Sequence, residues 1–164
     1  MPETRSHTVS WEIREPDPDA AGLSGLEIMR RNIARDSRHN PIAQLMGIRL
    51  ISAEPGVAVL ESFPGEHHYN PQGVTHGGYA ATLLDSALWS AVNTTIEPGF
   101  THTTLELKVS YARPITVATG RLLIEGRVLS RGKRVALTEA KITDEAGKLY
   151  AHGTSTLLII PKAA

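Results

Sequence analysis

The sequence contains no cysteine among its 164 residues. This absence excludes disulfide bonds, thiolate metal ligands and a cysteine nucleophile. An excess of one charge is also absent, because lysine plus arginine and aspartate plus glutamate each total 17. A chain without net charge has no overall attraction for nucleic acid or for an acidic membrane surface, so neither is expected as a partner.

Long apolar segments are lacking as well. No apolar run approaches the roughly 18 residues of a membrane-spanning helix, and residues 1–7 lack the apolar core of a signal peptide. These features predict a cytoplasmic protein that does not associate with a membrane. The length of the chain suits one domain with a sizeable core.

Residues 70–93 differ from the rest of the chain in their turn signals and in their lack of charge. The first part is Asn70-Pro-Gln-Gly73-Val-Thr-His76-Gly77-Gly78, in which proline and glycine mark a turn. Apolar residues then recur at helical spacing over residues 79–93, which predicts a helix. Because a solvated helix normally has lysine and glutamate on its outer face, this helix is expected to be mostly buried.

Asp85 is the only charged residue of the expected helix. A carboxylate at the border of an apolar face must find hydrogen-bond donors, shift its pKa or take part in a reaction. Gly77 and Gly78 stand where the helix begins, so their free N–H groups offer a site for an anion or a carbonyl oxygen. Asp85 follows roughly 10 Å further along the axis. A structural aspartate and a plain turn are the alternatives, but the combination with Asn70 and His76 just upstream favours an active site.

The spacing Asn70-x-x-Gly73-x-x-His76-Gly77-Gly78, followed by six residues and Asp85, resembles that of the hotdog-fold acyl-CoA thioesterases of the phenylacetate-pathway (PaaI-like) type. The resemblance covers roughly residues 42–161. It implies an α+β hotdog fold, in which a curved antiparallel sheet wraps around one long central helix. In this chain an N-terminal arm and helix over residues 1–40 would precede a hotdog thioesterase domain over residues 41–164.

The resemblance also implies a role for each residue of the motif. The Gly77 N–H would be the oxyanion donor, and Asp85 would act as general base or nucleophile, two alternatives that stay open. Asn70 would orient the attacking water, His76 would fix the loop or the carbonyl group, and Thr104 would hydrogen-bond the water or Asp85. Asp85 would come from the opposite subunit of a homodimer or of a dimer of dimers.

The substrate implied by the resemblance is an acyl-CoA with a small, medium or aromatic acyl group. No separate cofactor is expected, because coenzyme A is part of the substrate. The candidate substrate contacts are Gly78, Tyr79, Leu83, Trp89 and Tyr69 near the acyl group, and Arg131, Lys133 and Arg134 near the phosphates of the nucleotide. The large apolar side chains among them are equally compatible with a place in the core, and the three basic residues with a solvated turn.

The sequence gives weaker support to a metal site and to three other functions. His67, His68 and His76 lack a nearby carboxylate and a regular i, i+4 pair, so no metal site is expected. Ser90 and Ser155 lack the glycines of a nucleophile elbow, which disfavours a Ser-His-Asp hydrolase. A non-catalytic acyl-CoA-binding sensor would use the same pocket, but the first 40 residues are too short and too little basic for a DNA-binding module. The signature of a hotdog dehydratase or hydratase is not seen.

The remaining segments predict helices near the N-terminus, followed by strands. Residues 1–20 suggest a loose arm, in which Val9, Trp11 and Ile13 alternate as in a short strand. A helix is expected over residues 22–37, where Ser24 and Glu27 are spaced as a capping box, and a shorter one over residues 41–46.

Strands are expected over residues 48–53, 57–63, 104–111, 120–130, 133–144 and 149–160, with a hairpin turn at Arg131-Gly132. One helix cannot cover a six-stranded sheet from both sides, so the sheet should curl around it. The exposed sheet edges favour pairing with a second subunit.

Overall fold

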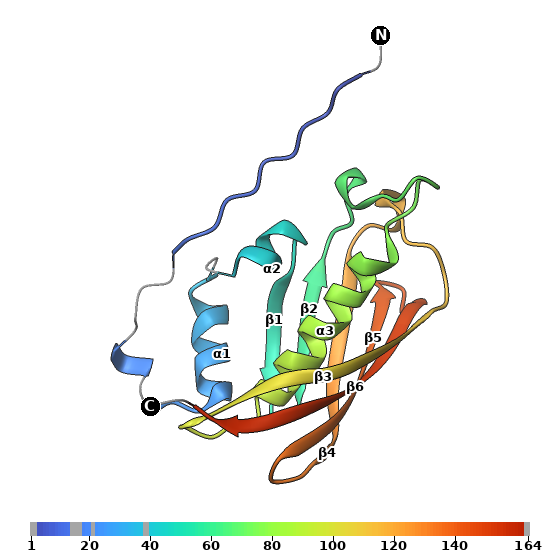
Figure 1. Ribbon diagram of the computed structural model, residues 1–164. Helices are drawn as coiled ribbons and strands as arrows, with labels where there is room; N and C mark the ends of the chain where they lie inside the picture. The colour runs from blue at the N-terminus through green and yellow to red at the C-terminus, as the bar shows by residue number, and fades with distance from the viewer. Residues whose placement is uncertain (1–2, 14–17, 21, 38–39, 163–164) are drawn as a thin grey trace.

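A computed structural model of the chain describes residues 3–13, 18–20, 22–37 and 40–162 (Figure 1). In chain order, its elements are η1 (Pro18–Ala20), α1 (Gly25–Ala34), α2 (Pro41–Leu45), β1 (Arg49–Glu54), β2 (Val57–Ser62), η2 (Glu66–His68), α3 (Gly77–Asn93), β3 (Phe100–Tyr111), η3 (Val117–Thr119), β4 (Leu122–Arg131), β5 (Val135–Asp144) and β6 (Leu149–Pro161). No helix among these described residues is long and apolar enough to cross a membrane.

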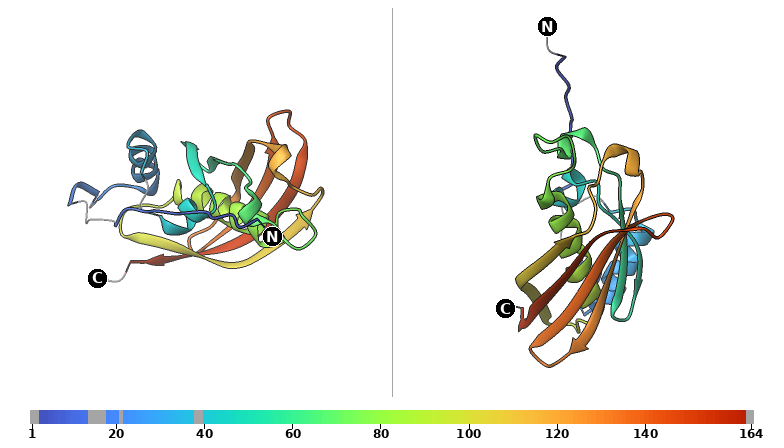
Figure 2. Two further views of the ribbon diagram at one scale, coloured as in Figure 1. Left: turned by 90° about the horizontal axis from the view of Figure 1, so that it is seen from above. Right: turned by 90° about the vertical axis from the view of Figure 1, so that its right-hand side faces the viewer.

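The six strands form one antiparallel sheet in the order β1-β2-β4-β5-β6-β3. The sheet twists and curves around α3, which lies along its inner face (Figures 1 and 2). This arrangement confirms the expected hotdog architecture. It also leaves β1 and β3 as the two edge strands of the sheet.

Small side chains allow α3 to lie very close to the sheet. Ala80, Ala87 and Ala91 are buried on the face of α3 that meets the strands. Opposite Ala87 the sheet has Gly126, where an added Cβ would stand 2.2 Å from the Ala87 carbonyl oxygen. No side chain fits in that space, so glycine is required at this position.

Capping residues set the ends of α1 and α2. The Ser24 hydroxyl accepts a hydrogen bond from the Glu27 N–H, and the Glu27 carboxylate accepts one from the Ser24 N–H, which confirms the capping box. The prediction of a helix over residues 22–37 was too long, because α1 begins only after this cap and Asp36, with φ 45°, has left the helical conformation. Gly47, with φ 61°, follows α2 as predicted.

The N-terminal arm is not a strand. Residues 3–13 have no regular secondary structure, and in Figure 1 they extend away from the sheet. Arg5 pairs with Glu66, and the ring of His7 stacks on that of His67 at 3.6 Å between centroids. The predicted strand through Val9 was therefore wrong, since an extended segment without a hydrogen-bonded neighbour forms no ladder. The division of the chain at residue 40 stays a prediction, although α1 packs on β1.

One buried carboxylate connects the strands on the outer face of the sheet. Glu61 on β2 is 3% exposed and forms ion pairs with Arg49 of β1 and with Arg121, which precedes β4. Burial by itself raises the pKa of Glu61, but hydrogen bonds and charges from the two arginines outweigh it, so this pKa lies below its usual value. The charged form of Glu61 therefore stabilises the folded state.

Replacing Glu61 by glutamine should reduce the free energy of unfolding by about 1–3 kcal/mol at pH 7, because hydrogen bonds to a charged group are lost. The matched change Glu125→Gln removes a carboxylate that pairs with Arg127 and Lys141 but is more exposed, and should cost less than about 1 kcal/mol. Urea unfolding of the three proteins measures both differences.

The pH dependence of the Glu61 contribution follows from the lowered pKa. The contribution should be complete above the ordinary glutamate pKa of about 4.3 and should disappear as the pH falls through the lower folded-state value. If Glu61→Gln and Glu125→Gln reduce the free energy of unfolding equally at pH 7, the stabilising role of the Glu61 ion pairs is contradicted.

Candidate active site

The first turn of α3 presents a free backbone donor. His76 is the N-cap, and its Nδ1 accepts a hydrogen bond of 2.9 Å from the Gly78 N–H. The Gly77 N–H has no hydrogen-bond partner among the described residues. This donor therefore stands at the positive end of a 17-residue helix, an arrangement suited to a carbonyl oxygen that gains negative charge.

The loop before α3 is shaped by Asn70. Its Oδ1 accepts hydrogen bonds from the N–H groups of Gln72, at 3.0 Å, and Val74, at 3.4 Å. The His76 N–H donates to the carbonyl oxygen of His68 at 2.8 Å, which fastens the end of the loop. Within the described residues, the amide NH₂ of Asn70 is the part of this side chain left for a substrate or a water.

Asp85 receives a hydrogen bond from the neighbouring strand. The Thr104 hydroxyl of β3 donates to Asp85 Oδ1 at 2.9 Å, and Asp85 itself is half-buried. The predicted contact between these two residues is therefore present. A fixed carboxylate of this kind is a suitable general base or nucleophile.

A β-bulge turns Thr104 toward the helix. In the sequence, Thr104, Glu106 and Lys108 alternate with Leu105, Leu107 and Val109, which predicts that the three polar residues share one face of the strand. Instead, the register between β3 and β6 shifts between Thr104 and Glu106. The inward and outward alternation of side chains before Leu105 is therefore out of step with that after it. Strict alternation was therefore the wrong prediction, and the bulge aims the hydroxyl at Asp85.

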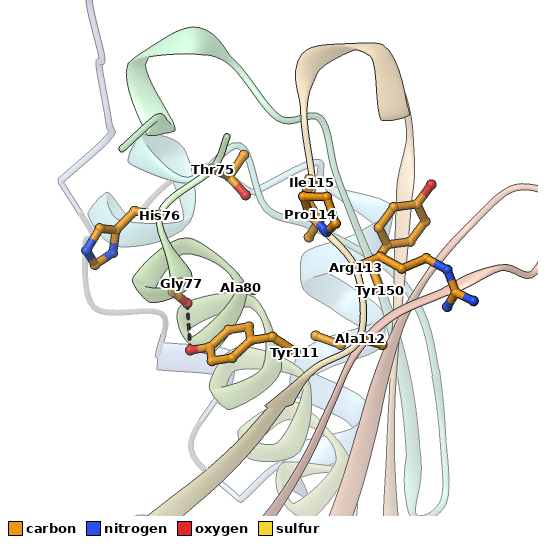
Figure 3. Close-up of a pocket in the computed structure, with 11 residues that line it drawn as sticks. Thr75, His76, Gly77, Ala80, Tyr111, Ala112, Arg113, Pro114, Ile115 and Tyr150 are labelled. Carbon is orange, nitrogen blue, oxygen red and sulfur yellow. Dashed lines mark hydrogen bonds between the residues drawn. The ribbon is translucent and has the colours of Figure 1, made fainter. Parts of the chain in front are cut away.

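Gly77 and Asp85 of one chain lie too far apart to act on the same carbonyl group. Eight residues of helix separate them, which corresponds to about 12 Å along the axis. They also line different cavities. Gly77 borders a cavity of about 320 Å³ near the start of α3 (Figure 3), whereas Asp85 borders a groove of about 1260 Å³ that extends toward α1 and α2.

Tyr111 was not identified from the sequence as a site residue. Its hydroxyl donates to the Gly77 carbonyl oxygen at 3.1 Å, and its ring forms one wall of the smaller cavity (Figure 3). In the sequence Tyr111 appears only as one more apolar position of a strand. Its place at the strand end, beside the start of α3, follows only from the sheet topology.

The structure places two of the candidate acyl contacts in the core. Leu83 has no exposed surface. Tyr79 is 3% exposed, and its hydroxyl lies 2.7 Å from the hydroxyl of Ser62. Burial raises the pKa of Tyr79 to about 12, although the hydrogen bond with Ser62 opposes this. The hydroxyl of Tyr69 accepts a hydrogen bond from the Val117 N–H, so it too stabilises the protein locally.

Trp89 is the candidate that lines the groove together with Asp85. It lies one helical turn beyond Asp85, and its ring packs on that of His102 at 4.5 Å between centroids. His102 Nε2 lies 3.0 Å from the Trp89 carbonyl oxygen. Burial keeps the pKa of His102 below its usual value, so the ring is neutral at pH 7. Two side chains of β3 thus hold two successive turns of α3.

The remaining histidines of the loop have structural partners. His68 stacks on Tyr79 at 4.2 Å between centroids, and its Nδ1 accepts a hydrogen bond from the Gly65 N–H. Among the described residues, no three histidine, aspartate or glutamate side chains are grouped so that they could hold a metal ion.

The three basic candidates lie at the other end of α3. Arg131 ends β4 and its Nε donates to the Thr95 hydroxyl at 3.2 Å, just after α3. Lys133 and Arg134 are exposed at the tip of the β4–β5 hairpin, whose loop, residues 132–134, is longer than the predicted two-residue turn. In Figure 1 this tip lies away from the start of α3.

Comparison with known proteins identifies the family. The model of the thioesterase superfamily matches residues 72–151. Human acyl-coenzyme A thioesterase 13 is 36% identical over 110 residues, which are 66% of this chain and 77% of the relative. A 1,4-dihydroxy-2-naphthoyl-CoA hydrolase from Listeria monocytogenes is 27% identical over 121 residues, 74% of this chain and 97% of the relative.

The fold is shared with the PaaI protein from the phenylacetic acid degradation operon of Escherichia coli. That structure superimposes with a TM-score of 0.73 at 22% identity, over 85% of this chain and 99% of the other. The chain belongs to the thioesterase superfamily and has the hotdog fold of its PaaI-like members. It is accordingly an enzyme of the thioester hydrolase class.

Removing the hydroxyl that holds Asp85 should impair hydrolysis without unfolding the protein. Thr104→Val keeps the shape of the side chain but removes the donor, so kcat should fall by about tenfold, the effect of losing one hydrogen bond of about 1.4 kcal/mol in the transition state. The control is Thr103→Val, the same change on an adjacent, exposed residue of β3. Steady-state kinetics and Tm are measured for both, and equal kcat values would contradict the role of Thr104.

Proposed function

We propose that the protein is an acyl-CoA thioesterase that hydrolyses small, medium or aromatic acyl-CoA to the free acid and coenzyme A. The observation that supports this most directly is the hydrogen bond from Thr104 to Asp85, the single charged residue of α3. The names of the human and Listeria relatives, which are a coenzyme A thioesterase and a naphthoyl-CoA hydrolase, agree with a coenzyme A thioester as substrate.

The reaction requires a base, a donor and water. Asp85 takes a proton from water, whose oxygen attacks the thioester carbonyl carbon, or attacks that carbon itself before water releases the acyl group. The carbonyl oxygen becomes negative and is held by the Gly77 N–H, a contribution of about 2.7–4 kcal/mol in comparable oxyanion sites. The C–S bond then breaks, and the sulfur of coenzyme A leaves and takes up a proton.

Two subunits complete one site in this proposal. Because about 12 Å of helix separates Gly77 from Asp85 in one chain, the second group must come from another copy. Edge strand β3 is the natural contact, since its side chains Phe100, Leu105 and Tyr111 are apolar and about half exposed. Pairing of such an edge with a second copy would bury these side chains and form a homodimer or a dimer of dimers.

The basic hairpin tip is proposed to hold the phosphates of coenzyme A. Thr95, which Arg131 contacts, lies ten residues beyond Asp85, or about 15 Å along the line of α3. Lys133 and Arg134 follow Arg131 in the same hairpin loop and are exposed. If the thioester group binds near Asp85, a long linker such as that of coenzyme A is needed for the nucleotide phosphates to reach these positive charges.

Replacing Asp85 by asparagine should lower kcat by about 100-fold or more, because the shape is kept while the base or nucleophile is lost. The matched control is Glu106→Gln, which removes an exposed carboxylate from β3. Release of free thiol from phenylacetyl-CoA measures turnover, and calorimetry measures binding. Tight binding without turnover by the unaltered protein would favour the acyl-CoA sensor instead.

A mixing experiment tests the shared site. Gly77→Pro removes the proposed N–H donor at the first position of α3, where proline suits the helical backbone although its Cβ would stand 3.1 Å from the Tyr111 hydroxyl. It should lower kcat by about 100- to 1000-fold. Co-expression of Gly77→Pro with Asp85→Asn produces mixed dimers in which one of two sites has both intact groups. Activity should return to about a quarter of the unaltered value if subunits assort randomly.

The two variants assayed separately are the control for this experiment. Light scattering should find a dimer or a tetramer in every sample. If the co-expressed sample is no more active than its two components, or if an unaltered monomer is active, the site lies within one chain.

A further inference from the structure

The ring of His102 has a buried nitrogen atom without a partner. His102 lies on β3, packs against α3 and is 5% exposed. Among the described residues, its Nδ1 is the only buried side-chain nitrogen or oxygen atom that forms no hydrogen bond. Buried polar groups in folded proteins almost always have a partner, so an exception of this kind requires a reason.

The other ring nitrogen determines where the hydrogen of the neutral ring stands. His102 Nε2 lies 3.0 Å from the Trp89 carbonyl oxygen, which can only accept a hydrogen bond. The hydrogen is therefore on Nε2, and Nδ1 keeps a lone pair. A second proton would have to bind at Nδ1, where the described residues offer no acceptor. The position thus favours the neutral ring over the charged one.

The surroundings of His102 also oppose its protonation. Of the basic residues around the β4–β5 hairpin, Arg131 acts on the ring and disfavours a second positive charge. The neighbouring strands add no charge, since residues 135–137 of β5 and 157–160 of β6 are apolar, and the chain neighbours of His102 are threonines. On α3 the single carboxylate is that of Asp85. Burial, followed by Arg131, keeps the pKa of His102 below its usual value, although the hydrogen bond to α3 acts in the opposite direction.

Trp89 connects His102 to the candidate base. Both residues lie within the helix α3, so the Trp89 N–H donates to the carbonyl oxygen of Asp85, four residues earlier. The turn from Asp85 to Trp89 is held by β3 at both ends, through the Thr104 hydroxyl at one end and through His102 at the other. The Trp89 side chain is 41% exposed and lines the same groove as Asp85. A movement of His102 would therefore reach both the carboxylate and one wall of the groove.

We propose that His102 is a positioning residue for Asp85, and that it holds the turn between Asp85 and Trp89 only while its ring is neutral. The inference rests on the proposed function, in which Asp85 carries out the chemical step. Uptake of a proton at Nδ1 adds a buried N–H without an acceptor, so the ring leaves its place and the Trp89 carbonyl loses its donor. Hydrolysis therefore has its full rate above the ordinary histidine pKa of about 6.5 and slows as the pH falls through the lower value of the folded protein.

Two variants, assayed with phenylacetyl-CoA over a range of pH, separate the hydrogen bond from the titration. His102→Gln keeps an N–H donor for the Trp89 carbonyl but takes up no proton, so kcat at pH 7 should stay close to the unaltered value and the loss at acid pH should begin at a lower pH. His102→Phe keeps an aromatic ring but removes the donor, so kcat at pH 7 should fall about tenfold. The matched control is His152→Gln, which removes a partly exposed histidine beside Glu139 and should leave the pH profile unchanged. Tm is measured for each variant.

Trp89 fluorescence provides a readout that a merely structural role would not change. The chain has two tryptophans, so Trp11→Phe leaves Trp89 as the single emitter. Indole emission responds to a neighbouring imidazole that becomes charged or moves away. The emission of Trp11→Phe should therefore change with pH at the same midpoint as kcat, and adding His102→Gln should abolish the change.

The results distinguish this inference from the proposed function. Trp89 emission that does not depend on pH would overturn the inference, as would a His102→Gln variant with the pH profile of the unaltered protein or a His102→Phe variant with its kcat at pH 7. In each of these cases the proposed function stands. An unaltered protein that hydrolyses no acyl-CoA would contradict the proposed function itself.

Discussion

The close contact between α3 and the sheet at Gly126 fixes the position of the helix along which the candidate site lies. The missing side chain at Gly126 lets the Ala87 backbone approach β4, and the neighbouring alanines of α3 add no bulk. Since backbone meets backbone here, the helix has little freedom to shift or rotate. This rigidity fixes the positions of Gly77 at the start of α3 and of Asp85 in its middle. Both groups of the candidate site are therefore positioned by packing to which neither contributes.

Three side chains of strand β3 hold this helix where the candidate site lies. The bulge in β3 directs Thr104 inward to Asp85, His102 supports the next turn through Trp89, and Tyr111 binds the carbonyl oxygen of Gly77. Yet β3 is also an edge strand, and one of its sides has no neighbouring strand among the described residues. On the proposed function, the strand that supports the candidate site would also meet the second copy, so assembly would be linked to completion of the site.

The sequence predicted the elements well and the contacts between them less well. The uncharged helix, its glycine start and Asp85 follow from periodicity and spacing, which are local properties. The inward turn of Thr104 depends on an extra residue in one strand relative to its neighbour, and the buried position of Tyr79 depends on Ser62 across the core. Tyr111 was missed for the same reason, because its partner is 34 residues away in the chain. Pairings of this kind are properties of the sheet and not of any segment.

The division of the site along α3 has a consequence for which positions can change without disturbing it. On the proposed function, the base belongs to the groove that contains Asp85, whereas the oxyanion donor Gly77 borders the smaller cavity beside residues 111–115. Tyr111 forms a wall of that cavity and holds the Gly77 carbonyl oxygen. Ile115 is buried, and its carbonyl oxygen accepts a hydrogen bond from the Thr75 N–H, two residues before Gly77. A change in size at either position would therefore reach the start of α3, whereas Ala112, which is exposed, can change with less effect on it.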